Sequence, residues 1–119
     1  MTRLLLAAAL VAALVAGCST GEKYGVLNAA APAVQVKDVL LDAANAGREV
    51  RLKGKITVQC ASSGCWFFLQ DGTGQILVDL QGLGLGLPQR SGKTAEVSGT
   101  VKIDREGQAT IEAKGLVIS

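Results

Sequence analysis

Apolar and polar residues alternate over most of the chain beyond residue 48, and this alternation predicts β-strands. One face of the first such stretch is apolar, and the other is basic or polar. The apolar face carries Val50, Leu52, Ile56, Val58 and Cys60. A period of two is typical of a half-buried strand. Comparable patterns predict four further strands, over residues 65–70, 75–80, 94–103 and 108–117. We therefore expect an all-β domain of five strands.

Two of the predicted strands contain a glycine near the middle. Gly54 interrupts VRLKGKI, and Gly99 interrupts EVSGTVKI. A glycine inside a strand marks a bend or bulge, and a bent strand can pair with two neighbours in a small closed barrel. Closure of this kind removes unpaired strand edges. The sequence DGTG (71–74) predicts a turn, and the glycine-rich stretch 81–93 predicts a loop with at most one turn of helix.

Before the strands, the apolar residues follow a helical period. Val36, Val39, Leu40 and Ala43 recur at helical spacing, and Gly47 supplies a stop, which predicts a short amphipathic helix over 36–45. The preceding residues have few large apolar side chains and indicate a tether. The expected organisation is a tether over 18–33 and one domain over 34–119, with the helix in 34–47 and the barrel in 48–118.

The first residues form a separate pattern, because residues 4–16 are continuously apolar and follow Arg3. This run is shorter than the ~20 residues that span a bilayer, and it fits a secretory signal. It ends in LVAGC (14–18), which resembles the lipobox of bacterial lipoproteins. The resemblance implies that residues 1–17 are removed, that the Cys18 thiol carries diacylglycerol, and that the new amino group is acylated, commonly with palmitate. The alternatives are a signal without lipid or an uncleaved apolar anchor.

The strand sequences also resemble a known fold. Together VRLKGKITV, WFFLQDGTGQILVDL and AEVSGTVKI are similar to the OB-fold, especially its anticodon-binding-like and small periplasmic bacterial branches. The resemblance covers about residues 48–118. It implies a five-stranded OB-fold-like barrel with a short N-terminal helix, preceded by the signal peptide and flexible tether. Since OB-folds bind many kinds of ligand, the resemblance is specific for the fold and not for a function.

The cysteines suggest the first candidate site. Once lipid occupies Cys18, Cys60 and Cys65 remain as a pair in an exported protein, where thiols tend to become disulfides. Both are expected at the mouth of the first hairpin, so we predict a structural disulfide. The alternatives are a labile redox pair and a two-thiolate copper(I) site. No basic residue lies between the two cysteines to lower a thiol pKa.

Aromatic and basic residues suggest two further surfaces. If Phe67 and Leu69 point inward, Trp66 and Phe68 point outward beside Leu77, on the face that OB-folds use for ligands. The alternative is that the helix or the glycine-rich loop covers them. The polar face of the first strand carries Arg51, Lys53 and Lys55. These side chains are either anion contacts or a solvated strand face.

Composition excludes several classes of function. Without Arg3 the chain has 11 basic and 10 acidic residues, a balance that argues against nucleic acid as a partner. The absence of histidine excludes a Ser/His/Asp triad and the common zinc sites. We therefore expect no catalytic residues, no resident metal and no cofactor apart from the lipid on Cys18. The expected partners are the membrane and an envelope protein. The expected location is the periplasmic side of a Gram-negative outer membrane, or otherwise the outer face of the plasma membrane.

Overall fold

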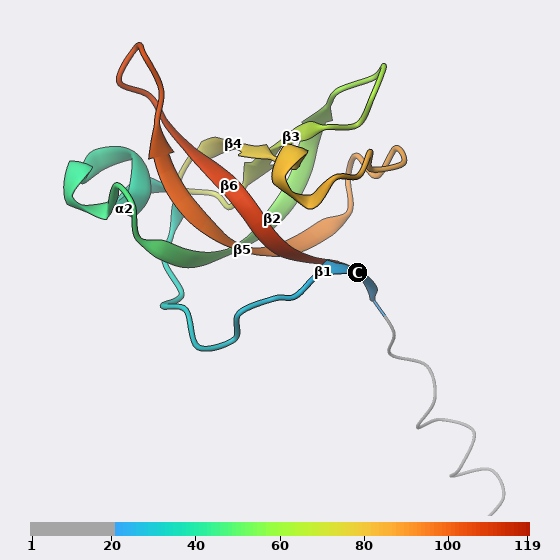
Figure 1. Ribbon diagram of the computed structural model, residues 1–119, viewed down its shortest axis with the longest axis horizontal. Helices are drawn as coiled ribbons and strands as arrows, with labels where there is room; N and C mark the ends of the chain where they lie inside the picture. Colours follow the sequence, from blue (N-terminus) through green and yellow to red (C-terminus); the bar gives the residue numbers. More distant parts are fainter. Residues whose placement is uncertain (1–20) are drawn as a thin grey trace, which may run out of the picture.

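The computed structural model describes residues 21–119 (Figure 1). The predicted signal peptide and Cys18 lie outside the described residues. The elements, in chain order, are β1 (Glu22–Gly25), α2 (Val36–Leu41), the 3-10 turn η1 (Ala43–Asn45), β2 (Glu49–Gln59), β3 (Trp66–Gln70), β4 (Gln75–Asp79), the 3-10 turn η2 (Gln81–Leu83), β5 (Thr94–Ile103) and β6 (Ala109–Ile118).

Five of the strands close into a barrel. Strand β2 pairs with β3, β3 with β4, β4 with β6, β6 with β5, and β5 again with β2. Only the β4–β6 pairing is parallel among these. This closed arrangement is consistent with the OB-fold. The five strands expected from the sequence are confirmed, with ends that agree within one or two residues.

The two mid-strand glycines lie where the barrel turns its corners. Strand β2 pairs with β5 from Glu49 to Lys55 and with β3 from Lys55 to Gln59, so it serves two neighbours as the sequence suggested. A side chain at Gly54 would collide with the carbonyl of Gln70, and one at Gly99 would collide with the backbone of β6. Both glycines are therefore required by close backbone contacts.

The predicted inward face of the first strand is wrong at its end. A bulge between Ile56 and Gln59 shifts the register of β2 against β3. As a result Val58 is 50% exposed, whereas Gln59 is 7% exposed. The buried Gln59 amide donates to the carbonyls of Leu87 and Pro88 at 2.9 and 2.7 Å. The side-chain carbonyl of Gln59 accepts from the backbone N–H of Arg90 at 2.8 Å. All three bonds of the Gln59 side chain therefore hold the loop before β5.

The segment expected to be a tether lies mostly against the barrel. Residues Glu22–Gly25 form β1, which pairs with the C-terminal end of β6. The chain then crosses the barrel, where the backbone N–H of Asn28 donates to the buried Ser98 hydroxyl at 2.9 Å. It ends in a bridge between Ala33 and Arg51. The contacts of this segment are made mainly by its backbone. Its small side chains therefore give no sign of them in the sequence.

The region expected to be one helix over 36–45 is two short pieces. Asp42, with φ −125° and ψ 102°, separates α2 from η1 and caps η1 by accepting from the N–H of Ala44. Helix α2 buries Val36 and Val39 at one end of the barrel (Figure 1). In the described part of the chain, no helix has both the length and the apolar character needed to cross a membrane.

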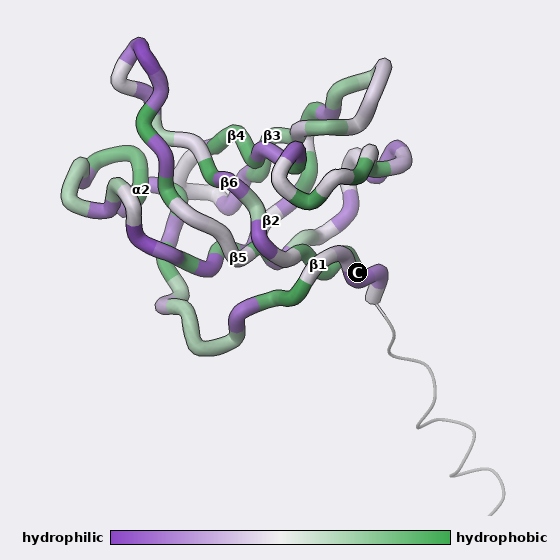
Figure 2. The backbone as a smooth tube through the Cα atoms, in the orientation of Figure 1, coloured by the Kyte–Doolittle hydropathy of each residue, from purple (hydrophilic) through white to green (hydrophobic). Residues whose placement is uncertain are grey.

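The core fills the barrel and extends under the glycine-rich connection. Leu87 is buried, and Leu83 and Leu85 pack against the core from the same connection. Figure 2 shows the strands as alternating hydrophobic and hydrophilic positions, while the tip between β5 and β6 is hydrophilic. The connection is thus a loop with one short turn, η2, as its glycine content predicted.

Candidate functional site

The outer surface of β3 carries two aromatic side chains. Phe67 and Leu69 are fully buried in the core, and Trp66 and Phe68 alternate with them on the other face. Both outward rings are half-buried. Their centroids lie 5.7 Å apart with the planes at 76°, an edge-to-face pair. This geometry is favourable for aromatic rings, and the inward and outward assignment predicted from the sequence is confirmed.

The neighbouring strands enlarge this aromatic surface. Phe68 lies directly opposite half-buried Leu77 on β4. Thr57 of β2 donates to the Phe68 carbonyl at 3.5 Å, and the exposed Val58 follows it. Trp66 lies opposite Asp79, which places a carboxylate at one edge. We call Trp66, Phe68 and Leu77 the aromatic face.

The helix and the glycine-rich loop contribute apolar side chains to the core. Their partly buried apolar residues that contact the core are Leu40, Leu83 and Leu85. The three residues of the aromatic face are not part of that core cluster. Each of the three side chains is half-buried, so part of each one reaches the solvent.

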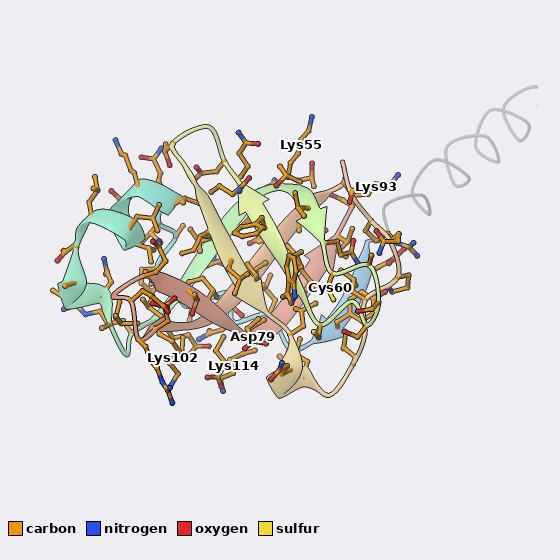
Figure 3. All side chains as sticks on the ribbon, turned by 90° about the horizontal axis from the view of Figure 1, so that it is seen from above. Lys55, Cys60, Asp79, Lys93, Lys102 and Lys114 are labelled. Atoms are coloured by element: carbon orange, nitrogen blue, oxygen red, sulfur yellow. The ribbon has the colours of Figure 1, made fainter. Side chains whose placement is uncertain are left out.

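The two cysteines flank a loop at the start of β3. Cys60 and Cys65 are both half-buried thiols in this structure, so their pairing as a disulfide stays a prediction. The hydroxyl of Ser63 donates to the Cys65 sulfur at 3.2 Å and lies 3.4 Å from the Cys60 sulfur. One small hydroxyl therefore contacts both sulfurs. Cys60 faces the end of the barrel where β3 begins (Figure 3).

The serines in this loop change the acidity of Cys60. Hydrogen bonds from the hydroxyls of Ser62 and Ser63, supported by their backbone N–H groups, lower the pKa of Cys60 from its ordinary value of 9.0 to about 5. A hydroxyl has one hydrogen and two lone pairs. The single Ser63 hydrogen can therefore point to either sulfur, and it stabilises a Cys60 thiolate when it is donated to Cys60. Sequence reasoning considered only basic neighbours and missed the pair of serines between the cysteines.

The cysteine loop (Cys60–Cys65) is fixed to the loop before β5. The Gly64 carbonyl accepts from the N–H of Leu87 at 2.9 Å, and the Gly64 N–H donates to the Cys60 carbonyl at 3.1 Å. Gly64 has a positive φ of 61°, and a side chain there would collide with the backbone of Leu87. These contacts hold the two thiols in place relative to Trp66, which follows Cys65 directly.

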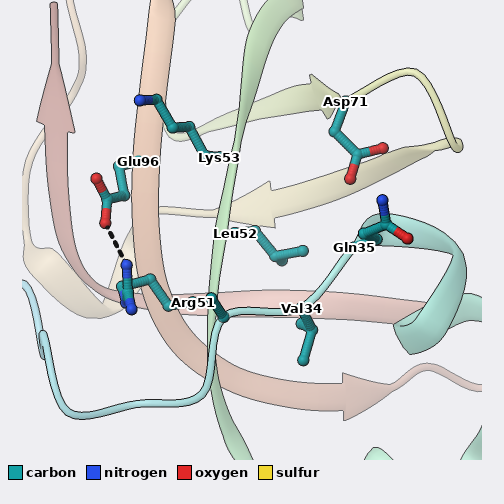
Figure 4. Close-up of a pocket in the computed structure, with 8 residues that line it drawn as sticks. Val34, Gln35, Arg51, Leu52, Lys53, Asp71 and Glu96 are labelled. Carbon is teal, nitrogen blue, oxygen red and sulfur yellow. Dashed lines mark hydrogen bonds and ion pairs between the residues drawn. The ribbon is translucent and has the colours of Figure 1, made fainter.

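The basic residues of β2 are placed differently from the aromatic face. Arg51 and Lys53 line a groove of about 410 Å³ together with Glu96 and Asp71 (Figure 4). The Arg51 guanidinium bonds Glu96 at 2.9 Å, and its Nε donates to the carbonyl of Ala31 at 3.4 Å. Lys53 lies opposite Glu96 in the strand register. Two cations and two carboxylates balance in this groove, so it has no excess charge for an anion.

Lys55, the third residue of that basic row, is exposed near the middle of β2 (Figure 3). It pairs in register with both Gln70 and Thr94 and lies outside the groove. Within residues 21–119 no group of three or more cysteine or acidic side chains is arranged to hold a metal ion. Cys60 and Cys65 are the two free thiols of the described residues.

Comparisons with known proteins define the fold only. No protein-family model matches the chain, and no curated protein matches it. Solved structures do match, 117 chains in all. One is the hypothetical protein ygiW from E. coli, with 21% identity, a TM-score of 0.60, and coverage of 80% of this chain and 98% of the other. The shared feature is the small barrel.

Proposed function

We propose that this protein is a non-enzymatic binding module of the cell envelope, with the aromatic face as its ligand surface. The observation that carries the proposal is the edge-to-face pair of Trp66 and Phe68 on the outside of the barrel, beside Leu77. Large aromatic groups are normally placed in the core, where they bury most surface. Two of them on an outer face, outside the core cluster, favour a partner with an apolar or flat surface.

The envelope location in this proposal rests on the sequence LVAGC. Lipid on Cys18 would hold the barrel at a membrane, since two or three acyl chains give durable anchoring. The destination we propose is the periplasmic face of the outer membrane, or the outer face of the plasma membrane in a cell with one membrane. The partner is an envelope protein or another envelope component, and the near-neutral charge disfavours nucleic acid.

The test compares Trp66→Ala with Leu41→Ala in the mature lipidated protein. Leu41 is an 83% exposed apolar residue on α2 and serves as the matched control. Each protein is cross-linked in intact cells and purified with its partners, and the unfolding of each is measured in parallel. We expect Trp66→Ala to lose the partner and to remain folded, and Leu41→Ala to retain it.

Two results would contradict the binding proposal. One is a folded Trp66→Ala protein that captures the same partner as the wild type. The other is an unfolded Trp66→Ala protein, which would assign Trp66 to the core. Mass spectrometry of the mature protein tests the anchor separately, because an unmodified Cys18 contradicts lipidation whatever happens at the aromatic face.

The cysteine loop supports a second candidate function, which is thiol chemistry. The shared Ser63 hydroxyl and the lowered pKa of Cys60 would make Cys60 the attacking thiolate in disulfide exchange. Oxidation of the pair would transfer two electrons to a partner disulfide, which is reduced to two thiols. The same two sulfurs would suit copper(I), which prefers soft ligands.

The reduction potential of the Cys60–Cys65 pair distinguishes a structural bond from an exchanging one. A potential below about −300 mV marks a structural disulfide and would contradict the exchange function. Copper(I) is tested with the reduced protein and the metal alone. Stoichiometric uptake that is lost in Cys60→Ser supports a metal function, and uptake that persists in this variant contradicts it.

A further inference from the structure

Strand β1 begins very close to the proposed lipid attachment. Only Ser19, Thr20 and Gly21 separate Cys18 from Glu22, the first residue of β1. Even a fully extended chain spans no more than ~3.6 Å per residue, so Glu22 lies within about 14 Å of Cys18. The headgroup layer of one leaflet is itself about 5–8 Å thick. A barrel attached in this way must lie against the headgroups.

The contacts of β1 fix which side of the barrel is presented. All four residues of β1 pair with β6, from Glu22 opposite Ile118 to Gly25 opposite Gly115. Just beyond, the N–H of Val26 donates to the carbonyl of Lys114 at 3.4 Å. Side chains at Gly25 or Gly115 would collide with this neighbouring backbone. Strand β1, which begins four residues after Cys18, is therefore part of the barrel wall.

The surface beside β1 combines apolar and basic groups. A groove of about 330 Å³ is lined by Lys23, Gly25, Val26, Leu27, Leu116 and Val117. Val26 is 82% exposed at the rim of this groove. Lys23 lies opposite Val117 in the strand register, so a cation stands directly beside the apolar groove.

More positive charge lies near the same end. The N–H of Ser119 donates to the carbonyl of Thr94, which brings Lys93 next to the end of β6 that pairs with β1. Lys55 lies opposite Thr94, and Figure 3 shows Lys55 and Lys93 near each other. Among the described residues, none of these three lysines forms an ion pair, and Glu22 is bonded by Arg90 at 3.0 Å. By contrast, Lys102 and Lys114 both contact Glu112.

We propose that this surface, which we call the β1 surface (Lys23, Val26, Leu27, Lys93 and Val117), is a membrane-contact surface that lies on phospholipid headgroups. The exposed Val26 and the half-buried Leu27 would enter the interface, and the unpaired lysines would face anionic headgroups. The proposal rests on the lipid anchor of the proposed function. It adds the orientation of the barrel, which presents the β1 surface to the bilayer and α2 away from it (Figure 1).

The experiment uses the mature lipidated protein in phosphatidylcholine vesicles with and without phosphatidylglycerol, each containing a phospholipid with a nitroxide on its headgroup. Trp66 is the sole tryptophan, so Trp66→Phe provides a dark background. A new tryptophan is introduced by Val26→Trp or, as the control, by Leu41→Trp. The two positions are 82% and 83% exposed in the structure. The lipid nitroxide should quench the tryptophan at position 26 at least about twofold more strongly than the one at position 41.

Charge is tested in the same assay. Lys23→Glu combined with Lys93→Glu should reduce the quenching at position 26, and the reduction should be larger in vesicles that contain phosphatidylglycerol. Equal quenching at the two positions, or none at position 26, would overturn the proposal. A second protein copy on the β1 surface would give the latter result, because it would shield position 26 from the lipid.

Flotation of the same vesicles tests the lipid anchor separately from the membrane-contact surface. A protein that floats with the vesicles while position 26 is unquenched overturns the membrane-contact surface and leaves the lipid anchor intact. A protein that carries no lipid and does not float overturns the anchor, and the membrane-contact surface with it.

Discussion

The two loops that flank β3 both contain polar side chains, but these side chains have different hydrogen-bond partners in the two loops. At one end, Asp71 accepts from the N–H of Val36 at 2.8 Å and from the hydroxyl of Thr73. Thr73 in turn accepts from the N–H of Lys37 at 3.1 Å. This turn therefore caps α2 and holds it over the end of the barrel. Its polar atoms are bonded to backbone N–H groups and to each other.

At the other end of β3 the polar atoms bond sulfur. The hydroxyls of Ser62 and Ser63 contact the two thiols and do not cap any helix. A backbone N–H cannot leave its partner without local unfolding, whereas a hydroxyl can rotate between two sulfurs. In this protein the polar side chains of one loop bond backbone N–H groups and fix α2, whereas those of the other loop contact the two sulfurs.

The largest effect that tests this contrast is the reactivity of Cys60. In the reduced protein, alkylation of Cys60 by iodoacetamide should reach half its maximal rate near pH 5, the value to which its pKa is lowered. At pH 6 the thiolate fraction should exceed that of an ordinary thiol by about a thousandfold. Peptide mass spectrometry measures the rate at each cysteine separately.

The cause of this reactivity is tested with two serine variants. Ser63→Ala should raise the pKa of Cys60 towards its ordinary value, because it removes a hydrogen bond to the thiolate. Ser91→Ala, at an exposed serine in the loop before β5, should leave the alkylation profile unchanged. An unchanged profile in Ser63→Ala would mean that the hydroxyl does not activate Cys60.

The second largest expected effect is on the free energy of unfolding and comes from Gln59, which lies at the same end of the barrel as the cysteine loop. Gln59→Ala would leave the carbonyls of Leu87 and Pro88 and the N–H of Arg90 without a partner. We expect the free energy of unfolding to fall by about 2–3 kcal/mol. The neighbouring Val58→Ala should change it by less than about 0.5 kcal/mol. Urea unfolding followed by circular dichroism measures both, and a larger loss for Val58→Ala would contradict the bulge.

That pair of residues also marks where prediction from sequence ends. Alternation gave the five strands and the inward side of β3, because burial of apolar side chains at every second position dominates both. The bulge in β2 cannot be derived from alternation, since one extra residue reverses every side chain beyond it. The alternating pattern assigned Val58 to the core. In the structure Gln59 is buried and Val58 is exposed, because Gln59 forms hydrogen bonds to the backbone of the loop before β5.

Strand β1 and the serine contacts were missed for a related reason. The segment around β1 has few large apolar residues, and its pairing is carried by backbone groups that any sequence possesses. Gly25 and Gly115 were the available signals, because both leave room for a close backbone approach. Among the candidate site residues, the outward placement of Trp66 and Phe68 was predictable, whereas the ion pair of Arg51 with Glu96 depends on the β2–β5 register.

Asp71 should give a smaller stability effect than Gln59. Partial burial raises the pKa of Asp71, but hydrogen bonds from Thr73 and from the N–H groups of Val36, Thr73 and Gly74 together lower it below 3.8. Its carboxylate thus stabilises the fold fully above pH 3.8, and this contribution is lost as the pH falls through the lower pKa of the folded state. Asp71→Asn should cost about 1 kcal/mol at pH 7, as for other helix caps.

The pH dependence provides the control for Asp71. The difference between wild type and Asp71→Asn, measured by urea unfolding, should shrink as the pH falls below 3.8, where the wild-type carboxyl is also protonated. A difference that is constant from pH 7 to pH 2 would show that the charge of Asp71 does not stabilise the turn.

We propose that the aromatic face binds a partner in the envelope. The most direct measurement is photo-cross-linking in living cells, with a benzophenone amino acid at position 68 and, in a separate protein, at position 41. Position 68 lies on the aromatic face, and position 41 lies on α2. The account predicts a discrete cross-linked product from position 68 and none from position 41. No product at position 68, or the same products from both positions, would contradict it.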